Sequence, residues 1–166
     1  MTDLVEIEHE EYQYVGSLNH SIIQARLARL LPDDNFTIAI ELSLDIKQTD
    51  VSQFNLKAKE ELVPDVCLYP NTIKFHPTDD VSKMQQMPLL SIEIISPRQG
   101  IDDIVNKFKA YFALGVKSCW LVIPTLKSIS VYSQMNNFNI FETKDDTEVT
   151  DKVLDIRVPL KKVFRE

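Results

Sequence analysis

Residues 88–97 read PLLSIEIISP, and the run from Leu89 to Ile95 is almost entirely aliphatic, with Glu93 in its middle. An aliphatic run of this length is typical of a strand inside a protein. An ionised carboxylate is costly to bury there unless another group pairs with it or it binds a metal ion. The chain must therefore fold around this strand and also supply a partner for Glu93.

Two other segments have the periodicity of amphipathic helices. Residues 17–32 can begin at a Ser17 or Asn19 cap and end at a proline. Residues 101–115 end at Gly115, which suits the left-handed conformation that commonly closes a helix. The apolar stripes are Ile23, Leu27, Leu30 and Leu31 in the first helix, and Ile101, Ile104, Val105, Phe108 and Phe112 in the second.

Several short segments are predicted to be strands. Residues 36–46 alternate, with Ile38 and Ile40 on one face and Glu41 on the other, which predicts one half-buried strand. Residues 63–70 form a short strand bounded by prolines. Further predicted strands are 118–124, a hairpin of 128–132 and 137–141 turning at Asn136 and Asn137, and the start of 153–164, which closes with a short helix.

The polar segments between these elements are predicted to be loops. They are residues 47–61, with Phe54 and Leu56 as apolar anchors, residues 71–87, and the acidic stretch 144–151.

The resulting order is helix, strand, strand, strand, helix, strand, followed by extra C-terminal strands. This order predicts an α/β or α+β fold with a mixed central sheet flanked by helices. The first three strands could pair as an antiparallel meander, and the strand after the second helix could join them by a crossover. A length of 166 residues fits a single domain, so we expect one over residues 1–166, with 1–15 as an irregular N-terminal segment.

The composition excludes several classes of protein. Glycine is scarce, with 3 residues, which argues against a glycine-rich nucleotide loop. No apolar run approaches the roughly 20 residues that span a bilayer, and the acidic start resembles no targeting signal, so we expect a cytoplasmic protein without membrane partners. Cys67 and Cys119 lie in apolar segments and are expected to be reduced core thiols.

The formal net charge of −7 bears on nucleic-acid binding. Proteins that bind nucleic acid usually carry a basic face, because phosphate neutralisation supplies much of the affinity. Charges more than about 8 Å apart scarcely interact at physiological salt, so a local basic patch or a bound cation could still serve. The charge lowers the expectation of a nucleic-acid substrate without excluding it.

Asp65 and Glu93 are the acids most able to form a site. If the strands that carry them are neighbours, their carboxylates can lie close enough to share one divalent cation. Without a cation the two would repel, and at least one would have its pKa raised. A shared metal ion would therefore explain Glu93.

A Pro64–Asp65 pair on one strand and Glu93 on the next, within this element order, resembles the PD-(D/E)XK nuclease superfamily. The segments PDVCLYP, PLLSIEIISPRQ and DDIVNKFKAYFALGVKSCWLVIP are similar, more narrowly, to a large bacterial "putative restriction endonuclease" family, formerly a domain of unknown function. These motifs span residues 64–124, and their combination is more specific than any one of them.

The resemblance implies a restriction-endonuclease-like core and a metal-dependent endonuclease that hydrolyses DNA phosphodiester bonds with Mg²⁺ or Mn²⁺. The superfamily lysine, two residues after the glutamate, is Ile95 here, and Lys107 on the following helix is the matching position. The implied catalytic residues are Asp65, Glu93 and Lys107, and the metal ligands are Asp65 and Glu93 with Glu41 as a further candidate. Related nucleases often act as two-fold dimers, so we expect a homodimer.

Each of these residues also has a structural interpretation. Asp65 could cap a turn, and Glu93 could pair with a basic neighbour. Lys107 could pair with Asp103, four residues earlier on the helix, for a few tenths of a kcal/mol. Glu41 could be a solvated strand residue.

Three further residues are predicted to be structural. His20 reads as a surface or cap residue that could line the site, because no acid or nucleophile lies beside it in the sequence. Tyr111 and Trp120 are expected in the core.

Two other functions fit the same residues. A nuclease-like scaffold without turnover, acting as an interaction or regulatory module, agrees with the acidic charge and the missing strand lysine. A small-molecule phosphohydrolase could use the same metal site.

Overall fold

The structure of the protein is a computed structural model that describes residues 16–47, 49–58 and 60–166. The expected irregular segment 1–15 lies outside these residues. The helices are α2 (Leu18–Leu30), α3 (Ile101–Ala113) and α4 (Leu160–Phe164), with short 3₁₀ turns at Ser52–Phe54 and Pro124–Leu126. The strands are β1 (Phe36–Ile40), β2 (Leu44–Asp45), β3 (Glu61–Leu62), β4 (Val66–Pro70), β5 (Leu90–Ile94), β6 (Ser118–Ile123), β7 (Ser128–Gln134), β8 (Asn137–Glu142), β9 (Glu148–Asp151) and β10 (Ile156–Pro159).

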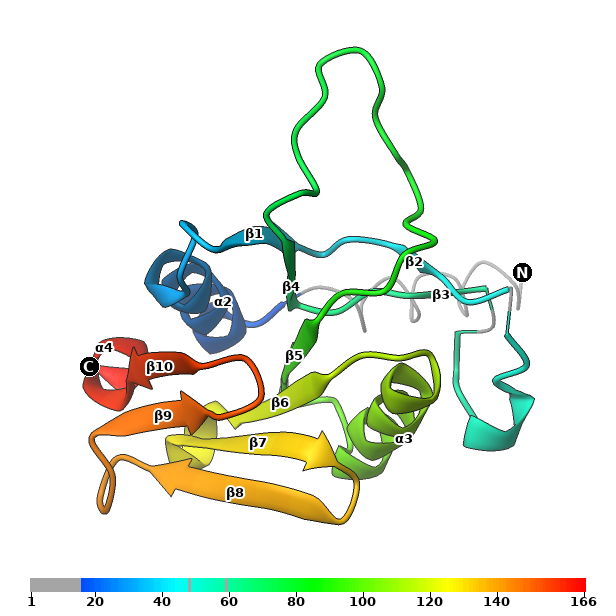
Figure 1. Cartoon of the computed structure of the whole chain (residues 1–166). Helices are drawn as coiled ribbons and strands as arrows, with labels where there is room; N and C mark the ends of the chain where they lie inside the picture. The colour runs from blue at the N-terminus through cyan, green and yellow to red at the C-terminus, as the bar shows by residue number, and fades with distance from the viewer. Residues whose placement is uncertain (1–15, 48, 59) are drawn as a thin grey trace, which may run out of the picture.

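Within the described residues, six strands form the central sheet in the order β1-β4-β5-β6-β7-β8 (Figure 1). β1, β4 and β5 pair antiparallel, so the predicted meander is confirmed. β5 and β6 run parallel and are joined through α3, which is the predicted crossover. The sheet is therefore mixed, as the element order indicated.

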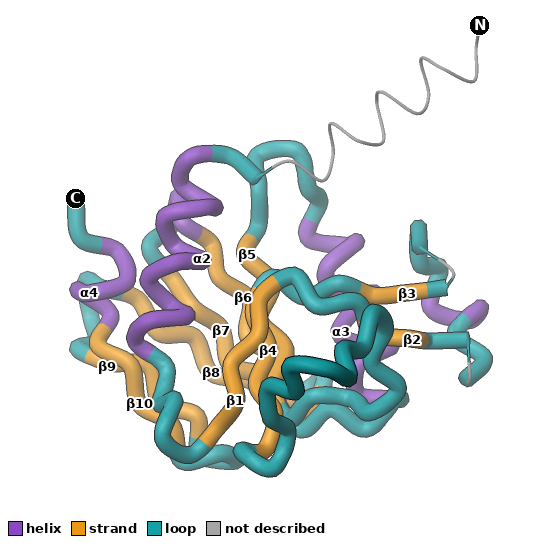
Figure 2. The backbone as a smooth tube through the Cα atoms, turned by 90° about the horizontal axis from the view of Figure 1, so that it is seen from above, coloured by secondary structure: helices purple, strands orange, loops and turns teal. Residues whose placement is uncertain are grey.

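The helices lie on opposite sides of this sheet, as Figure 2 shows for α2 and α3. Because side chains alternate along a strand, each face has its own core. The face toward α2 and α4 buries Leu27, Ile92 and Trp120, whereas the face toward α3 buries Tyr69 and Phe108. The mixed sheet flanked by helices is confirmed.

Most of the local predictions hold. The side chain of Ser17 caps α2, and Gly115 adopts a φ of 102° after α3. Phe54 and Leu56 are partly buried and pack against the core on the α3 side of the sheet, so their prediction as apolar anchors is confirmed. No described helix is both long enough and apolar enough to traverse a bilayer.

The predicted single strand over residues 36–46 is wrong beyond Ile40. Glu41 has a φ of 50°, a left-handed conformation that interrupts an extended chain. Leu44 and Asp45 instead pair with β3 in a separate small sheet. As a result Ile38 packs on the α2 side and Leu44 on the α3 side, although simple alternation had placed them on one face.

Two smaller predictions also need correction. The second half of the acidic stretch 144–151 is strand β9, which pairs with β10, because Val149 and Asp151 point into the protein. The hairpin between β7 and β8 turns at Met135 and Asn136, one residue earlier than predicted.

Candidate active site

Asp65 and Glu93 come together through the pairing of β4 with β5. Val66 pairs with Ile92, and the Asp65 amide donates a hydrogen bond to the Ile92 carbonyl at 3.1 Å. Asp65 directly precedes β4, and this hydrogen bond places it beside the end of β5 that carries Glu93. Both side chains line one pocket of about 450 Å³.

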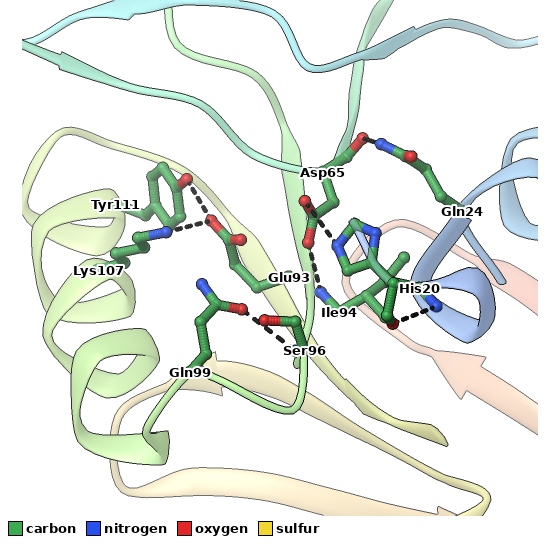
Figure 3. Close-up of polar contacts among 10 residues, drawn as sticks. His20, Gln24, Asp65, Glu93, Ile94, Ser96, Gln99, Lys107 and Tyr111 are labelled. Carbon is green, nitrogen blue, oxygen red and sulfur yellow. Dashed lines mark hydrogen bonds and ion pairs between the residues drawn. The ribbon is translucent and has the colours of Figure 1, made fainter. Parts of the chain in front are cut away.

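Glu93 is 1% exposed. The Tyr111 hydroxyl donates to its Oε1 at 2.8 Å, and Lys107 Nζ lies 3.8 Å from the same oxygen. The pKa of Glu93 is raised to about 7, chiefly by burial; Lys107 opposes this rise, whereas the nearby Asp65 adds to it. In Figure 3 the second oxygen of Glu93 points away from Tyr111 and Lys107, toward the side on which Asp65 lies. The buried charge is therefore only partly compensated.

Asp65 is held on both of its carboxylate oxygens. The Ile94 amide donates to Oδ2 at 2.7 Å, and His20 Nε2 lies 3.1 Å from Oδ1. Gln24, one turn after His20 on α2, donates to the Asp65 main-chain carbonyl at 2.9 Å. The side chain and backbone of Asp65 are thus fixed by β5 and α2 together (Figure 3).

His20 is the site residue that sequence reasoning underestimated. It is 7% exposed and lines the pocket, and its acidic partner lies 45 residues later in the chain. The hydrogen bond with Asp65 raises the pKa of His20, while burial lowers it. One local signal for the position of His20 was the Ser17 cap three residues earlier, because it places His20 in the first turn of α2.

Lys107 and Tyr111 project from the same side of α3, one turn apart (Figure 3). The alternative pairing of Lys107 with Asp103 is absent from the ion pairs of the described chain, since Asp103 contacts Lys57 at 3.0 Å. Ile95 stands at the position of the superfamily lysine. It is partly buried and packs against the core on the α3 side of the sheet.

Glu41 lines the same pocket from the end of β1, and its amide donates to the Asp65 carbonyl at 3.3 Å. Unlike Glu93, it is exposed. The pocket therefore brings together all four predicted site residues: Glu41, Asp65, Glu93 and Lys107. Tyr111 and Trp120 are both fully buried, as expected of core residues.

The acidic side chains of the pocket are possible ligands for a divalent ion. In the described part of the chain, no three His, Cys, Asp or Glu side chains gather in a cluster that could hold an ion. Mg²⁺ does not need one, because one or two carboxylates with waters and substrate oxygens commonly suffice. Asp65 and Glu93 supply hard oxygen donors of that kind, so the residues fit such an ion.

The architecture, a mixed sheet with a meander, a helical crossover and helices on both faces, is a nuclease-like α+β fold. The model of a protein family described as "Putative restriction endonuclease", Uma2, matches residues 10–159, and the chain belongs to this family. A crystal structure of "a putative nuclease belonging to DUF820" from Anabaena variabilis superposes with a TM-score of 0.71 at 18% identity, covering 90% of this chain and 82% of that one. No curated protein matches by sequence.

Proposed function

We propose that the protein is a Mg²⁺- or Mn²⁺-dependent endonuclease that hydrolyses DNA phosphodiester bonds. Asp65 and Glu93 would hold the ion, Glu41 would offer a further carboxylate, and Lys107 would act on the substrate phosphate. One observation carries the proposal: a carboxylate just before β4 and a carboxylate on its partner strand β5 share a single pocket with a lysine from the crossover helix. Membership of the family described as "Putative restriction endonuclease" supports the same activity.

The chain's own residues have separate tasks in this proposal. Tyr111 fixes one oxygen of Glu93 by its hydrogen bond, which leaves the other to bind. Lys107, whose side chain is 25% exposed, presents its ammonium at the pocket, where it can stabilise charge on a phosphoryl oxygen or orient water. A bound divalent ion supplies Lewis-acid stabilisation and lowers the pKa of a water molecule.

DNA is the proposed substrate despite the net charge of −7. Lys57, Arg98 and Lys107 line the pocket beside its carboxylates, so a bound divalent ion would act together with these three basic groups on an approaching phosphate. Because screening limits the reach of distant acidic residues, this local arrangement matters more than the total charge. Binding should weaken steeply as salt is raised.

We also propose that the protein acts as a homodimer, since a chain of 166 residues offers little surface to grip a duplex. Light scattering at micromolar concentration should give a mass near twice 19.1 kDa. A mass of one chain across the concentration range would reject the dimer without bearing on the pocket.

The activity is tested with purified protein, Mn²⁺, and linear, supercoiled and single-stranded DNA. Glu93→Gln should abolish cleavage, because it removes the charge that holds the ion. Glu148→Gln is the matched control, since Glu148 pairs with Arg157 on β9 and β10 and does not line the pocket. Cleavage that survives Glu93→Gln unchanged would assign the activity to another site or to a contaminant.

A second candidate function is a nuclease-like module without turnover. The contacts that favour it are His20 with Asp65 at 3.1 Å and Lys107 with Glu93 at 3.8 Å, because each acid then has a basic neighbour. Calorimetric titration separates the two functions. A metal-dependent nuclease should bind Mn²⁺ at a site that Asp65→Asn removes, whereas a degenerate site should give no heat in either protein.

A further inference from the structure

We propose that His20 is a positioning residue that fixes the Asp65 carboxylate for metal binding. This inference rests on the proposed function and adds to it a residue from α2, outside the strands and crossover helix that carry the other candidates. His20 would not touch the ion or the substrate, and it would act through Asp65.

The start of α2 places the His20 ring with little freedom. Ser17 Oγ accepts a hydrogen bond from the His20 amide at 3.3 Å, which caps the helix. A Cβ atom added to Gly16 would lie 3.0 Å from His20 Nδ1, so a larger residue at this position would crowd the ring. In Figure 3 the His20 ring presents Nε2 to Asp65.

Asp65 is then restrained from two directions. His20 holds Oδ1 and the Ile94 amide holds Oδ2, so rotation of the carboxylate would break one contact or the other. Each carboxylate oxygen accepts about two hydrogen bonds or ligands, so both contacts leave positions for an ion. Metal-binding carboxylates are commonly oriented by such outer hydrogen bonds.

The other ring nitrogen argues against a merely structural histidine. Nδ1 is buried and has no hydrogen-bond partner within the described residues. An apolar side chain would fill the position without leaving a polar atom unsatisfied. The contact that requires a polar donor at this position is the one from Nε2 to Asp65.

The test is calorimetric titration of the full chain with Mn²⁺, without DNA. His20→Leu should weaken Mn²⁺ binding by about 10- to 100-fold, the usual effect of losing an outer hydrogen bond. His20→Gln, whose amide can donate to Asp65 from a similar reach, should restore affinity to within about threefold of the unmodified protein. Asn19→Leu is the matched control on the neighbouring exposed position of α2.

The outcomes separate this inference from the proposed function. If the unmodified protein binds Mn²⁺ and the folded His20→Leu variant binds it equally well, His20 does not position Asp65, and the proposed function stands. If His20→Leu fails to fold, a His20→Gln variant with affinity as poor as that of Asp65→Asn also overturns the inference. If the unmodified protein binds no Mn²⁺, the proposed function is wrong, and this inference is wrong with it.

Discussion

Two buried acids in this protein have opposite surroundings. Asp151 is fully buried and accepts hydrogen bonds from the Ser118 hydroxyl, the Trp120 indole and the amides of Val153 and Leu154. Glu93 is equally buried, but among the described residues its hydrogen-bond and ion-pair partners are the Tyr111 hydroxyl and Lys107, whose Nζ lies 3.8 Å away. Burial alone therefore does not mark a site. The incomplete compensation of Glu93 is the feature on which the proposed metal site rests.

The raised pKa of Glu93 predicts a pH-dependent stability in metal-free protein. With its pKa raised from 4.5 to about 7, the folded state binds the proton more tightly than the unfolded state. Stability should fall as pH rises from about 4.5 to 7, by on the order of 3 kcal/mol in total, because one pKa unit is worth about 1.4 kcal/mol. Urea denaturation in EDTA, followed by Trp120 fluorescence, measures this.

Glu93→Gln isolates that contribution. The variant should be more stable than the unmodified protein at pH 8.5, where burial of a charge is avoided, and the advantage should disappear at pH 4.5. Glu148→Gln should show no such pH-dependent difference. A Glu93→Gln variant destabilised equally at both pH values would mean that the carboxylate is well compensated after all.

Tyr111→Phe tests the hydrogen bond that holds Glu93. Hydrogen bonds to charged groups contribute about 1.5–3 kcal/mol, against about 0.5–1.5 for neutral pairs, so the loss should grow from pH 5 to pH 8.5 as Glu93 ionises. Tyr69→Phe is the matched control, because the buried Tyr69 donates to the Gln86 carbonyl, which does not titrate. A loss that is the same at both pH values for Tyr111→Phe would contradict the assigned bond.

At the scale of the elements, Asp151 joins the β9–β10 hairpin to the central sheet, because its donors come from β6 and from the turn after β9. Asp151→Ala would leave several buried donors unpaired and should destabilise the protein by about 3–5 kcal/mol in chemical denaturation. Asp145→Ala, at an exposed position, should change stability by less than about 0.5 kcal/mol. Equal effects would show that the hairpin does not depend on Asp151.

The local sequence pattern was sufficient to predict the elements that bury one continuous face. The helix around Leu27, the aliphatic strand around Glu93 and the crossover helix ending at Gly115 all follow from periodicity and caps. Pattern failed where the backbone changes face. At Glu41 the backbone adopts a left-handed conformation and the chain leaves the central sheet for a second one. The apolar and polar residues still alternate across this point, so no local signal distinguishes Glu41 from a strand residue.

The same limit applies to the site. Asp65, Glu93 and Lys107 could be chosen from the sequence because their spacing matches a known pattern and adjacent strands bring them together. The contact of His20 with Asp65 joins helix α2 to the start of β4, and only the packed fold shows it. Contacts between distant segments depend on how layers are stacked, which periodicity does not encode.

At the scale of the whole molecule, the pocket lies where both helical layers reach the same end of the sheet. α2 contributes His20 and Gln24 from one side, and α3 contributes Lys107 and Tyr111 from the other, with the two acids between them (Figure 3). Within one pocket, Asp65 therefore has His20 as its basic neighbour, whereas Glu93 has Lys107. Acidic and basic side chains therefore line the same pocket.

The most direct test of this account is a crystal structure of the protein soaked in Mn²⁺, with anomalous diffraction to locate the metal. We predict a single strong peak within coordination distance of one oxygen of Asp65 and of the Glu93 oxygen that faces away from Tyr111. Saturating Mn²⁺ with no peak between the two carboxylates, while both keep their basic neighbours, would contradict the metal site and leave only the fold.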